Sequence, residues 1–144
     1  MSTYSQLYIQ IVFAVKYRQK LIRPGIREEV HKYITGIIKK EGHKLYAIYC
    51  MPDHCHIFVS MHPKQSISDL VRIVKANSSK WINKSGLVKE QFRWQEGFGA
   101  FSYSILRKKQ IIRYILKQES HHKFITSSTE YQALLEEFEI GCQN

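Results

Sequence analysis

The chain has 144 residues, and its 22 Lys and Arg against 12 Asp and Glu give a formal net charge of +10 at pH 7. This length suits one domain, so we expect residues 1–144 to fold as a single unit around a sizeable core. No window has the roughly 18 consecutive apolar residues of a membrane span, and the N-terminus lacks a signal-peptide pattern. Three cysteines without a Cys-x-x-Cys pair argue against disulfides and a thiolate zinc site, and favour the cytoplasm.

The positive charge is concentrated in the first 119 residues. From Ser120 onward Lys123 is the one basic residue against four glutamates, which leaves 21 basic and eight acidic residues before that point. Such a field favours a polyanionic partner, and nucleic acid is the first candidate. An anionic membrane surface is a weaker candidate, because the basic residues are spread over several predicted elements rather than along one amphipathic helix.

Hydrophobic patterning predicts strand, helix, strand, strand in the first half of the chain. Leu7–Val15 is almost continuously apolar, as is typical of an interior strand. Apolar residues recur at helical spacing over Ile26–Glu41. Lys44–Cys50 then reads as a strand that turns through Pro-Asp into a further strand, His54–Ser60.

The second half continues this pattern with a helix, a strand and two more helices. A serine N-cap precedes a helix over Ile67 to about Asn83, and Gly99–Tyr103 reads as a strand. A serine-capped helix is predicted from Ile105 to about His122, followed by a short acidic helix over Glu130–Phe138. The order predicts an α+β, ferredoxin-like (βαββαβ) antiparallel sheet with helices on one face, plus a C-terminal helix and a tail helix.

The strand His54–Ser60 places two histidines in register. Because side chains alternate along a strand, His54 and His56 share one face, which we expect to be open, away from the helices. Two imidazoles in this arrangement can share a metal ion, although His-x-His alone is a weak motif and packed or solvated histidines are the alternative. The other face is apolar and is predicted to meet the helices through Cys55, Ile57 and Val59.

The predicted helix from Ile105 carries Tyr114 and Gln118, which lie four apart on one face. Alone they read as a half-buried aromatic and a surface amide. With the histidines they supply the parts for phosphoryl transfer, namely a metal site, an attacking hydroxyl and an amide oxygen ligand. A phenol with a pKa of about 10 needs metal or cationic neighbours to attack. Two histidines and one amide leave open positions, which suits Mg²⁺ or Mn²⁺.

Two segments in this order and spacing resemble a known family. Met-Pro-Asp-His-Cys-His-Ile at Met51–Ile57 and Tyr-Ile-Leu-Lys-Gln-Glu-Ser-His-His at Tyr114–His122 are similar to the single-tyrosine HUH transposases of small bacterial insertion sequences. Cys55 stands at the middle position of that family's His-hydrophobic-His motif. The resemblance extends over roughly Leu7 to Phe138 and includes Ile11–Phe13, Lys16–Arg18 and Trp94–Ser102.

The resemblance implies a ferredoxin-like homodimer that binds single-stranded DNA, often folded as hairpins near the ends of the element. It implies that Tyr114 attacks a DNA phosphate, forms a 5′-phosphotyrosine and releases a 3′-hydroxyl. It also implies that His54, His56 and Gln118 hold the metal. In several members the tyrosine helix reaches the histidines of the other subunit, so the active sites can be shared.

Further residues are candidates for DNA contacts. Phosphate contacts, with a solvated surface as the alternative for each, are predicted at Lys16, Arg18, Lys75, Lys80 and Arg107. Trp94, Phe98 and Phe101 could stack on bases, although core packing is expected for at least two of them. The acidic tail helix is expected to be structural, and Gln10 is assigned no role.

Three other functions use parts of the same pattern. A ferredoxin-like module that binds single-stranded nucleic acid without catalysis would favour aromatics on the sheet face, where this chain has His-Cys-His. A domesticated relative that acts on host repeat hairpins would use the same residues as the transposase. A metallohydrolase that activates water would need a general base, which the sequence does not offer beside the histidines.

Overall fold

The computed structural model of the chain describes residues 2–118 and 127–138. In order, the elements are β1 (Tyr8–Ala14), η1 (Lys16–Arg18), α1 (Pro24–Lys40), β2 (Lys44–Met51), β3 (His54–Ser60), α2 (Ile67–Ser85), β4 (Gly99–Tyr103), η2 (Ile105–Arg107), α3 (Lys108–Leu116) and α5 (Ser127–Glu137). This order confirms the predicted α+β class and βαββαβ arrangement, and each strand begins and ends within one residue of its predicted bounds.

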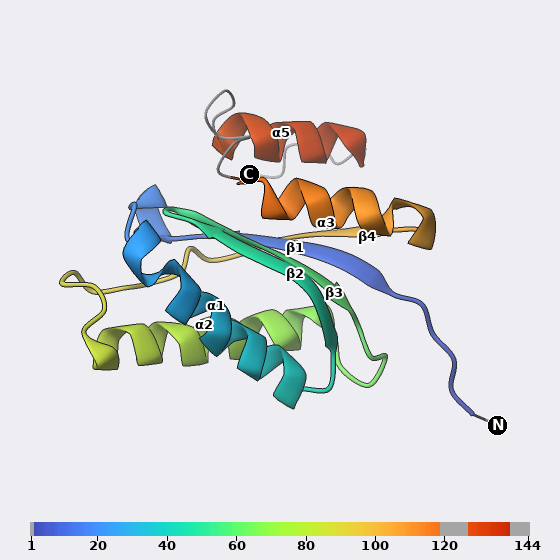
Figure 1. Ribbon diagram of the computed structural model, residues 1–144, viewed down its shortest axis with the longest axis horizontal. Helices are drawn as coiled ribbons and strands as arrows, with labels where there is room; N and C mark the ends of the chain where they lie inside the picture. Colours follow the sequence, from blue (N-terminus) through green and yellow to red (C-terminus); the bar gives the residue numbers. More distant parts are fainter. Residues whose placement is uncertain (1, 119–126, 139–144) are drawn as a thin grey trace.

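The four strands form one antiparallel sheet in the order β2-β3-β1-β4. Helices α1 and α2 cover one face of the sheet, and α3 and α5 lie on the other (Figure 1). β1 is central, and its register sets Val12 opposite His56 and Ala14 opposite His54. The histidines therefore lie on an interior strand, where pairing on both sides fixes the direction of their side chains.

The face toward α1 and α2 holds the main hydrophobic core. The alternation predicted for β3 is confirmed, because Cys55, Ile57 and Val59 are all buried there. α2 begins at the predicted serine N-cap, where the Ser66 hydroxyl accepts a hydrogen bond of 3.0 Å from the Asp69 amide. It ends at Gly86, whose left-handed φ of 70° suits a residue without Cβ.

The opposite face of the sheet is covered, which corrects the expectation that the histidine face is open. Ile111 and Ile115 of α3 pack with Phe58 of β3, and Leu134 of α5 packs against β1 and β4. The histidines are consequently buried, with exposed fractions of 2% for His54 and 0% for His56. A helix with an apolar stripe is stabilised when that stripe is buried. Helix α3 buries its stripe on the sheet face that α1 and α2 leave uncovered.

The predicted helix from Ile105 to about His122 is not continuous. It starts as the short 3₁₀ turn η2, becomes α3 at Lys108 and ends at Leu116, and Ser104 makes no side-chain cap. Lys117 leaves the helical conformation, with φ −102° and ψ 19°. The apolar stripe that binds α3 to the sheet ends at Ile115, since Leu116 is exposed. His121 and His122 lie outside the described residues.

Within the described residues, no helix has the length and apolar character needed to cross a membrane.

Candidate metal and nucleophile site

His54 and His56 each use one ring nitrogen for a neighbour inside the protein. His54 Nδ1 lies 2.7 Å from the Asp53 carboxylate, and His56 Nδ1 lies 2.9 Å from the side-chain oxygen of Gln10. Both partners accept hydrogen bonds, so each Nδ1 carries a proton. Each Nε2 is thereby directed to the same side of the sheet, which is the orientation that metal-ligating histidines require.

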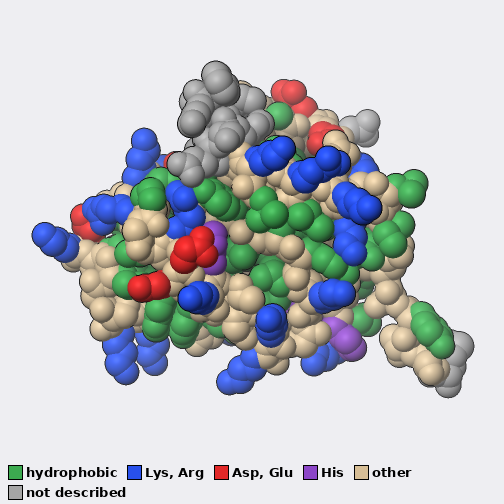
Figure 2. Space-filling model, in the orientation of Figure 1, with side chains coloured by type: hydrophobic (Ala, Val, Ile, Leu, Met, Phe, Trp, Pro, Cys, Tyr) green, Lys and Arg blue, Asp and Glu red, His purple; other side chains and the backbone are tan. Residues whose placement is uncertain are grey.

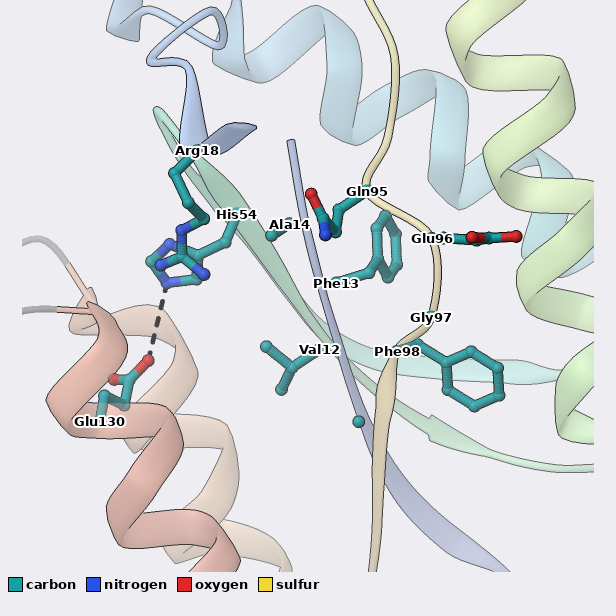
Figure 3. Close-up of a pocket in the computed structure, with 11 residues that line it drawn as sticks. Val12, Phe13, Ala14, Arg18, His54, Gln95, Glu96, Gly97, Phe98 and Glu130 are labelled. Atoms are coloured by element: carbon teal, nitrogen blue, oxygen red, sulfur yellow. Dashed lines mark ion pairs between the residues drawn. The ribbon is translucent and has the colours of Figure 1, made fainter. Parts of the chain in front are cut away.

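A carboxylate from the C-terminal helix meets the two Nε2 atoms. Glu130 Oε1 lies 2.8 Å from His56 Nε2 and 3.6 Å from His54 Nε2, and Glu130 is itself buried. Figure 3 shows this side chain pointing from α5 toward His54. Glu130 was not among the predicted site residues, because it lies 74 residues from His56 and in a helix that we expected to be structural.

The electrostatics of this cluster follow from burial and pairing. Burial alone would raise the pKa of the Glu130 carboxyl, but the ion pair with His54 and the hydrogen bond with His56 outweigh it and hold that pKa well below its usual range. For His54, burial would lower the pKa, and the hydrogen bond with Asp53 and the ion pair with Glu130 raise it instead. The cluster thus stabilises a carboxylate between two imidazoles.

Tyr114 projects from α3 toward the histidines. Its ring centre is 6.0 Å from that of His56, with the two rings nearly perpendicular. Burial, reinforced by the nearby Glu130 carboxylate, holds the pKa of the Tyr114 phenol well above its ordinary value. The phenol is therefore protonated in this arrangement, and its use as a nucleophile would require a bound cation to offset the negative charge.

Gln118 lies next to Tyr114 although the helix ends between them. Its side-chain nitrogen is 3.3 Å from the Tyr114 carbonyl oxygen, and the residue is fully buried. The structure therefore places all four sequence-predicted site residues on one face of the sheet, with the histidines on β3 and the tyrosine and glutamine at the end of α3. The structure also places Glu130 of α5 beside these four residues.

The donor atoms of this cluster fit a divalent cation. His54, His56 and Glu130 each offer one ligand atom, and these atoms all lie within 4.8 Å of one another. Bonds of about 2.1 Å at right angles would place neighbouring ligand atoms about 3 Å apart. The 2.8 and 3.6 Å separations from Glu130 to the two nitrogens bracket this value. Two histidines and a carboxylate also leave open positions for water or substrate.

Gln10 is a second residue whose function the sequence analysis did not recognise. It is fully buried on β1, where its oxygen accepts from His56 and its nitrogen donates to the Tyr103 hydroxyl at 3.0 Å. The amide therefore fixes both the tautomer and the ring orientation of His56. Its polar character at an otherwise apolar interior strand is the signal that could have identified it.

Replacing Gln10 with Ala is expected to weaken metal binding by about 10- to 100-fold, because His56 would lose its orienting partner. Titration of the full chain with Mn²⁺ by calorimetry measures this loss. Gln65→Ala is the matched control, since Gln65 accepts a comparable 2.7 Å hydrogen bond from a histidine, His43, in another part of the fold. Undiminished affinity in Gln10→Ala would contradict the orienting role.

A cavity gives access to the buried site from one side. It has a volume of about 260 Å³ and is lined by His54, Glu130, Arg18 and residues 12–14 and 95–99 (Figure 3). Arg18 forms a 3.4 Å ion pair with Asp53, the carboxylate partner of His54. Arg18 was predicted as a phosphate contact, and it lies at this cavity, joined to the histidine through Asp53.

The other predicted phosphate contacts lie in different settings. Lys16 and Lys75 line a wide groove of about 700 Å³, in which Arg72 and Arg93 also lie. Lys75 is partly buried and donates to the Gln95 carbonyl at 2.8 Å, and burial lowers its pKa. Lys80 is exposed on α2. Lys and Arg side chains are spread over the face in Figure 2 rather than gathered in one patch.

Arg107 and the candidate stacking residues differ in exposure. Arg107 donates to Glu137 of α5 at 2.6 Å, so its guanidinium contributes to helix docking. Trp94 and Phe101 are buried in core clusters, as expected for at least two of the three aromatics. Phe98 is 37% exposed and lines both the cavity and the groove.

Comparison with known proteins gives the family to which this fold and site belong. The sequence profile of the family described as "Transposase IS200 like" matches residues 3–118. This chain therefore belongs to the IS200-like transposase family. The match ends before α5, so Glu130 lies beyond the part that the family profile covers.

Individual relatives agree with this assignment. The ISDra2 transposase TnpA of Deinococcus radiodurans is 27% identical over 122 residues, which cover 81% of this chain and 85% of the relative. The transposase for insertion sequence element IS200 of Salmonella typhimurium is 28% identical over 87 residues, which cover 60% of this chain and 57% of the relative.

Two solved structures share the fold. One, of a Deinococcus radiodurans protein assigned as a transposase, has a TM-score of 0.64 at 21% identity and covers 82% of this chain and 95% of its own. The other, a REP-associated tyrosine transposase bound to a REP hairpin, has a TM-score of 0.64 at 14% identity, covering 87% and 76%.

Proposed function

We propose that this protein is a metal-dependent transposase that cleaves and rejoins single-stranded DNA through a 5′-phosphotyrosine at Tyr114. The observation that carries the proposal is the placement of the Tyr114 phenol beside a pair of buried histidines whose Nε2 atoms face the same side. In this reaction the phenol oxygen forms a bond to phosphorus while the bond to the 3′ oxygen breaks. The aryl ester conserves the bond for the later rejoining step.

Each site residue has a defined task in this proposal. His54, His56 and the Gln118 amide oxygen would hold the cation, Mg²⁺ or Mn²⁺, beside the Tyr114 nucleophile. The cation supplies charge stabilisation at the scissile phosphate. Asp53 and Gln10 keep the two imidazoles in the binding orientation. Because α3 packs on the sheet through Ile111 and Ile115, the phenol is held near the histidines before substrate arrives.

The substrate we propose is single-stranded DNA, most often carried on a hairpin at an element end. Residues 95–98 line both the basic groove and the cavity at His54, so the two lie side by side. Lys16, Arg72 and Arg93 would contact its phosphates, and Phe98 offers a surface on which a base can stack. A structural neighbour bound to a REP hairpin supports a hairpin substrate, and also a domesticated relative acting on host repeats.

We also propose a homodimer as the functional assembly. Within one chain Tyr114 lies beside its own His56, which supports attack in cis in this state. Gly97, with a φ of 86°, lies in the segment that leads to β4 and α3, where a change of backbone direction would carry α3 to a second subunit. Mixing His56→Ala and Tyr114→Phe subunits tests the arrangement, because shared sites would restore activity and separate sites would not.

The experiment that tests the function is cleavage of labelled single-stranded DNA hairpins in the presence of Mn²⁺. We expect nicked product and a covalent protein–DNA species from hairpin-bearing single strands, and neither from the same sequences as full duplexes. Binding of the hairpins without any cleavage, over a library of sequences, would instead support the binding module without catalysis.

One observation favours a second candidate, a hydrolase that activates water. The sequence offers no base beside the histidines, whereas the structure places the Glu130 carboxylate there. Cleavage in water labelled with ¹⁸O separates the two reactions. Hydrolysis places the label in the first product phosphate, whereas attack by Tyr114 forms the protein ester without it.

Lys16→Ala is expected to weaken binding of single-stranded DNA, because Lys16 lines the basic groove. Loss of one phosphate contact should reduce the slope of log K against log salt by about 0.7. Fluorescence anisotropy at several salt concentrations measures this slope. Lys39→Ala on α1 removes the same charge at an exposed position outside the groove and should leave the slope unchanged.

A further inference from the structure

We infer that Glu130, carried by the C-terminal helix α5, is a further protein ligand of the divalent metal and that α5 is thereby part of the metal site. This inference rests on the proposed metal-dependent function and extends it to a residue outside the segment that the family profile matches. The starting observation is the position of one carboxylate oxygen, 2.8 Å from His56 Nε2 and 3.6 Å from His54 Nε2.

The position of Glu130 is set by contacts of α5 that do not involve the histidines. Leu134 is buried against Val12 and Phe101, and the Phe138 ring lies 4.9 Å from the Phe101 ring. Glu137, the last residue of α5, accepts a 2.6 Å hydrogen bond from Arg107. The second half of α5 therefore packs against the sheet. This packing positions the Glu130 carboxylate, in the first turn of the helix, beside the histidines.

The chemistry of a carboxylate suits this place better than a purely neutral ligand set. Two imidazoles and the Gln118 amide carry no charge, so they would offset none of the charge of a buried divalent ion. Glu130 adds one negative charge and a hard oxygen, which Mg²⁺ and Mn²⁺ prefer. Two histidines, one amide and one carboxylate occupy four of about six positions, so water and a phosphate oxygen can fill the other two.

A ligand on α5 links metal binding to the docking of this helix. Whatever binds the docked form and not the undocked form stabilises the docked form. Metal should therefore slow opening of α5, and the effect should need the Glu130 carboxylate. With a site made only of His54, His56 and Gln118, metal would not change how often α5 opens. This difference distinguishes the two arrangements.

The test is calorimetric titration of the full chain with Mn²⁺, comparing Glu130→Gln with the wild type. The amide keeps the size of the side chain and removes the charge, and we expect affinity to fall by about 10- to 100-fold. Glu136→Gln is the matched control, because it removes the same charge from an exposed position on α5 and should bind within about twofold of the wild type. Hydrogen exchange of the α5 amides should slow with Mn²⁺ in the wild type and the control, and not in Glu130→Gln.

Each other outcome overturns the inference. Equal or tighter Mn²⁺ binding by Glu130→Gln would identify the carboxylate as an occupant that the metal displaces. Metal protection of α5 in Glu130→Gln would show coupling without ligation. His56→Ala distinguishes failure of this inference from failure of the proposed function. If the wild type binds Mn²⁺ and His56→Ala does not, the histidine metal site is supported even when Glu130→Gln binds as well as the wild type. No Mn²⁺ binding by the wild type would overturn both.

Discussion

Tyr114→Phe is expected to abolish the covalent protein–DNA adduct and to reduce cleavage by about 1,000-fold or more, because the substitution removes the attacking oxygen. The ring stays in place, so its packing against His56 and the α3 stripe is retained. Folding, metal affinity and binding of single-stranded DNA should therefore remain close to wild type. A denaturing gel with 5′- and 3′-labelled hairpins measures adduct and nicked product together.

Tyr46→Phe is the control for this variant. Tyr46 belongs to the same hydrophobic cluster as Tyr114, and Lys108 lies over its ring at 4.1 Å, an interaction that Phe preserves. This control should form adduct at the wild-type rate. An adduct that survives in Tyr114→Phe would place the nucleophile on another residue and would contradict the assignment of Tyr114.

His56→Ala should have the second large effect, the loss of both metal binding and adduct formation. The residue is fully buried, and its two ring nitrogens contact Gln10 and Glu130. Removing the imidazole takes one hydrogen-bond partner away from Gln10 and from Glu130. Each loss should lower the free energy of unfolding by about 1–3 kcal/mol. Mn²⁺ titration and the free energy of unfolding in urea measure the two consequences separately.

The stability loss needs its own control, which the chain provides in His43→Ala. His43 is also buried, accepts from the His62 amide at 2.9 Å and pairs with Gln65. Its removal should destabilise the fold and leave metal affinity unchanged in the protein that remains folded. Retained Mn²⁺ affinity in His56→Ala would be incompatible with a metal site at β3.

Local patterning was sufficient to predict β3 and the direction of its side chains. Alternation placed Cys55, Ile57 and Val59 in the core and both histidines on the other face, and the structure confirms the separation. It was insufficient for what covers that face, because periodicity within one strand carries no information about a helix that packs on it from elsewhere in the chain. The expectation of an open face was wrong for this reason.

The residues that sequence reasoning missed are those whose function depends on distant partners. Gln10 meets His56 across the β1–β3 pairing, and Glu130 reaches it from 74 residues away. Arg107 appears in the sequence as a free cation for DNA, and its ion pair with Glu137 depends on where α5 docks. Motif spacing predicted Tyr114 and Gln118 because these two are local neighbours.

Mapping the covalent adduct tests the central claim most directly. Wild-type protein is incubated with single-stranded DNA hairpins and Mn²⁺, digested with nuclease and protease, and the peptides are analysed by mass spectrometry. The account predicts a nucleotide linked through its 5′-phosphate to Tyr114, present with Mn²⁺ and absent with EDTA. Cleaved DNA with no linked peptide, or a linkage to another residue, would contradict it.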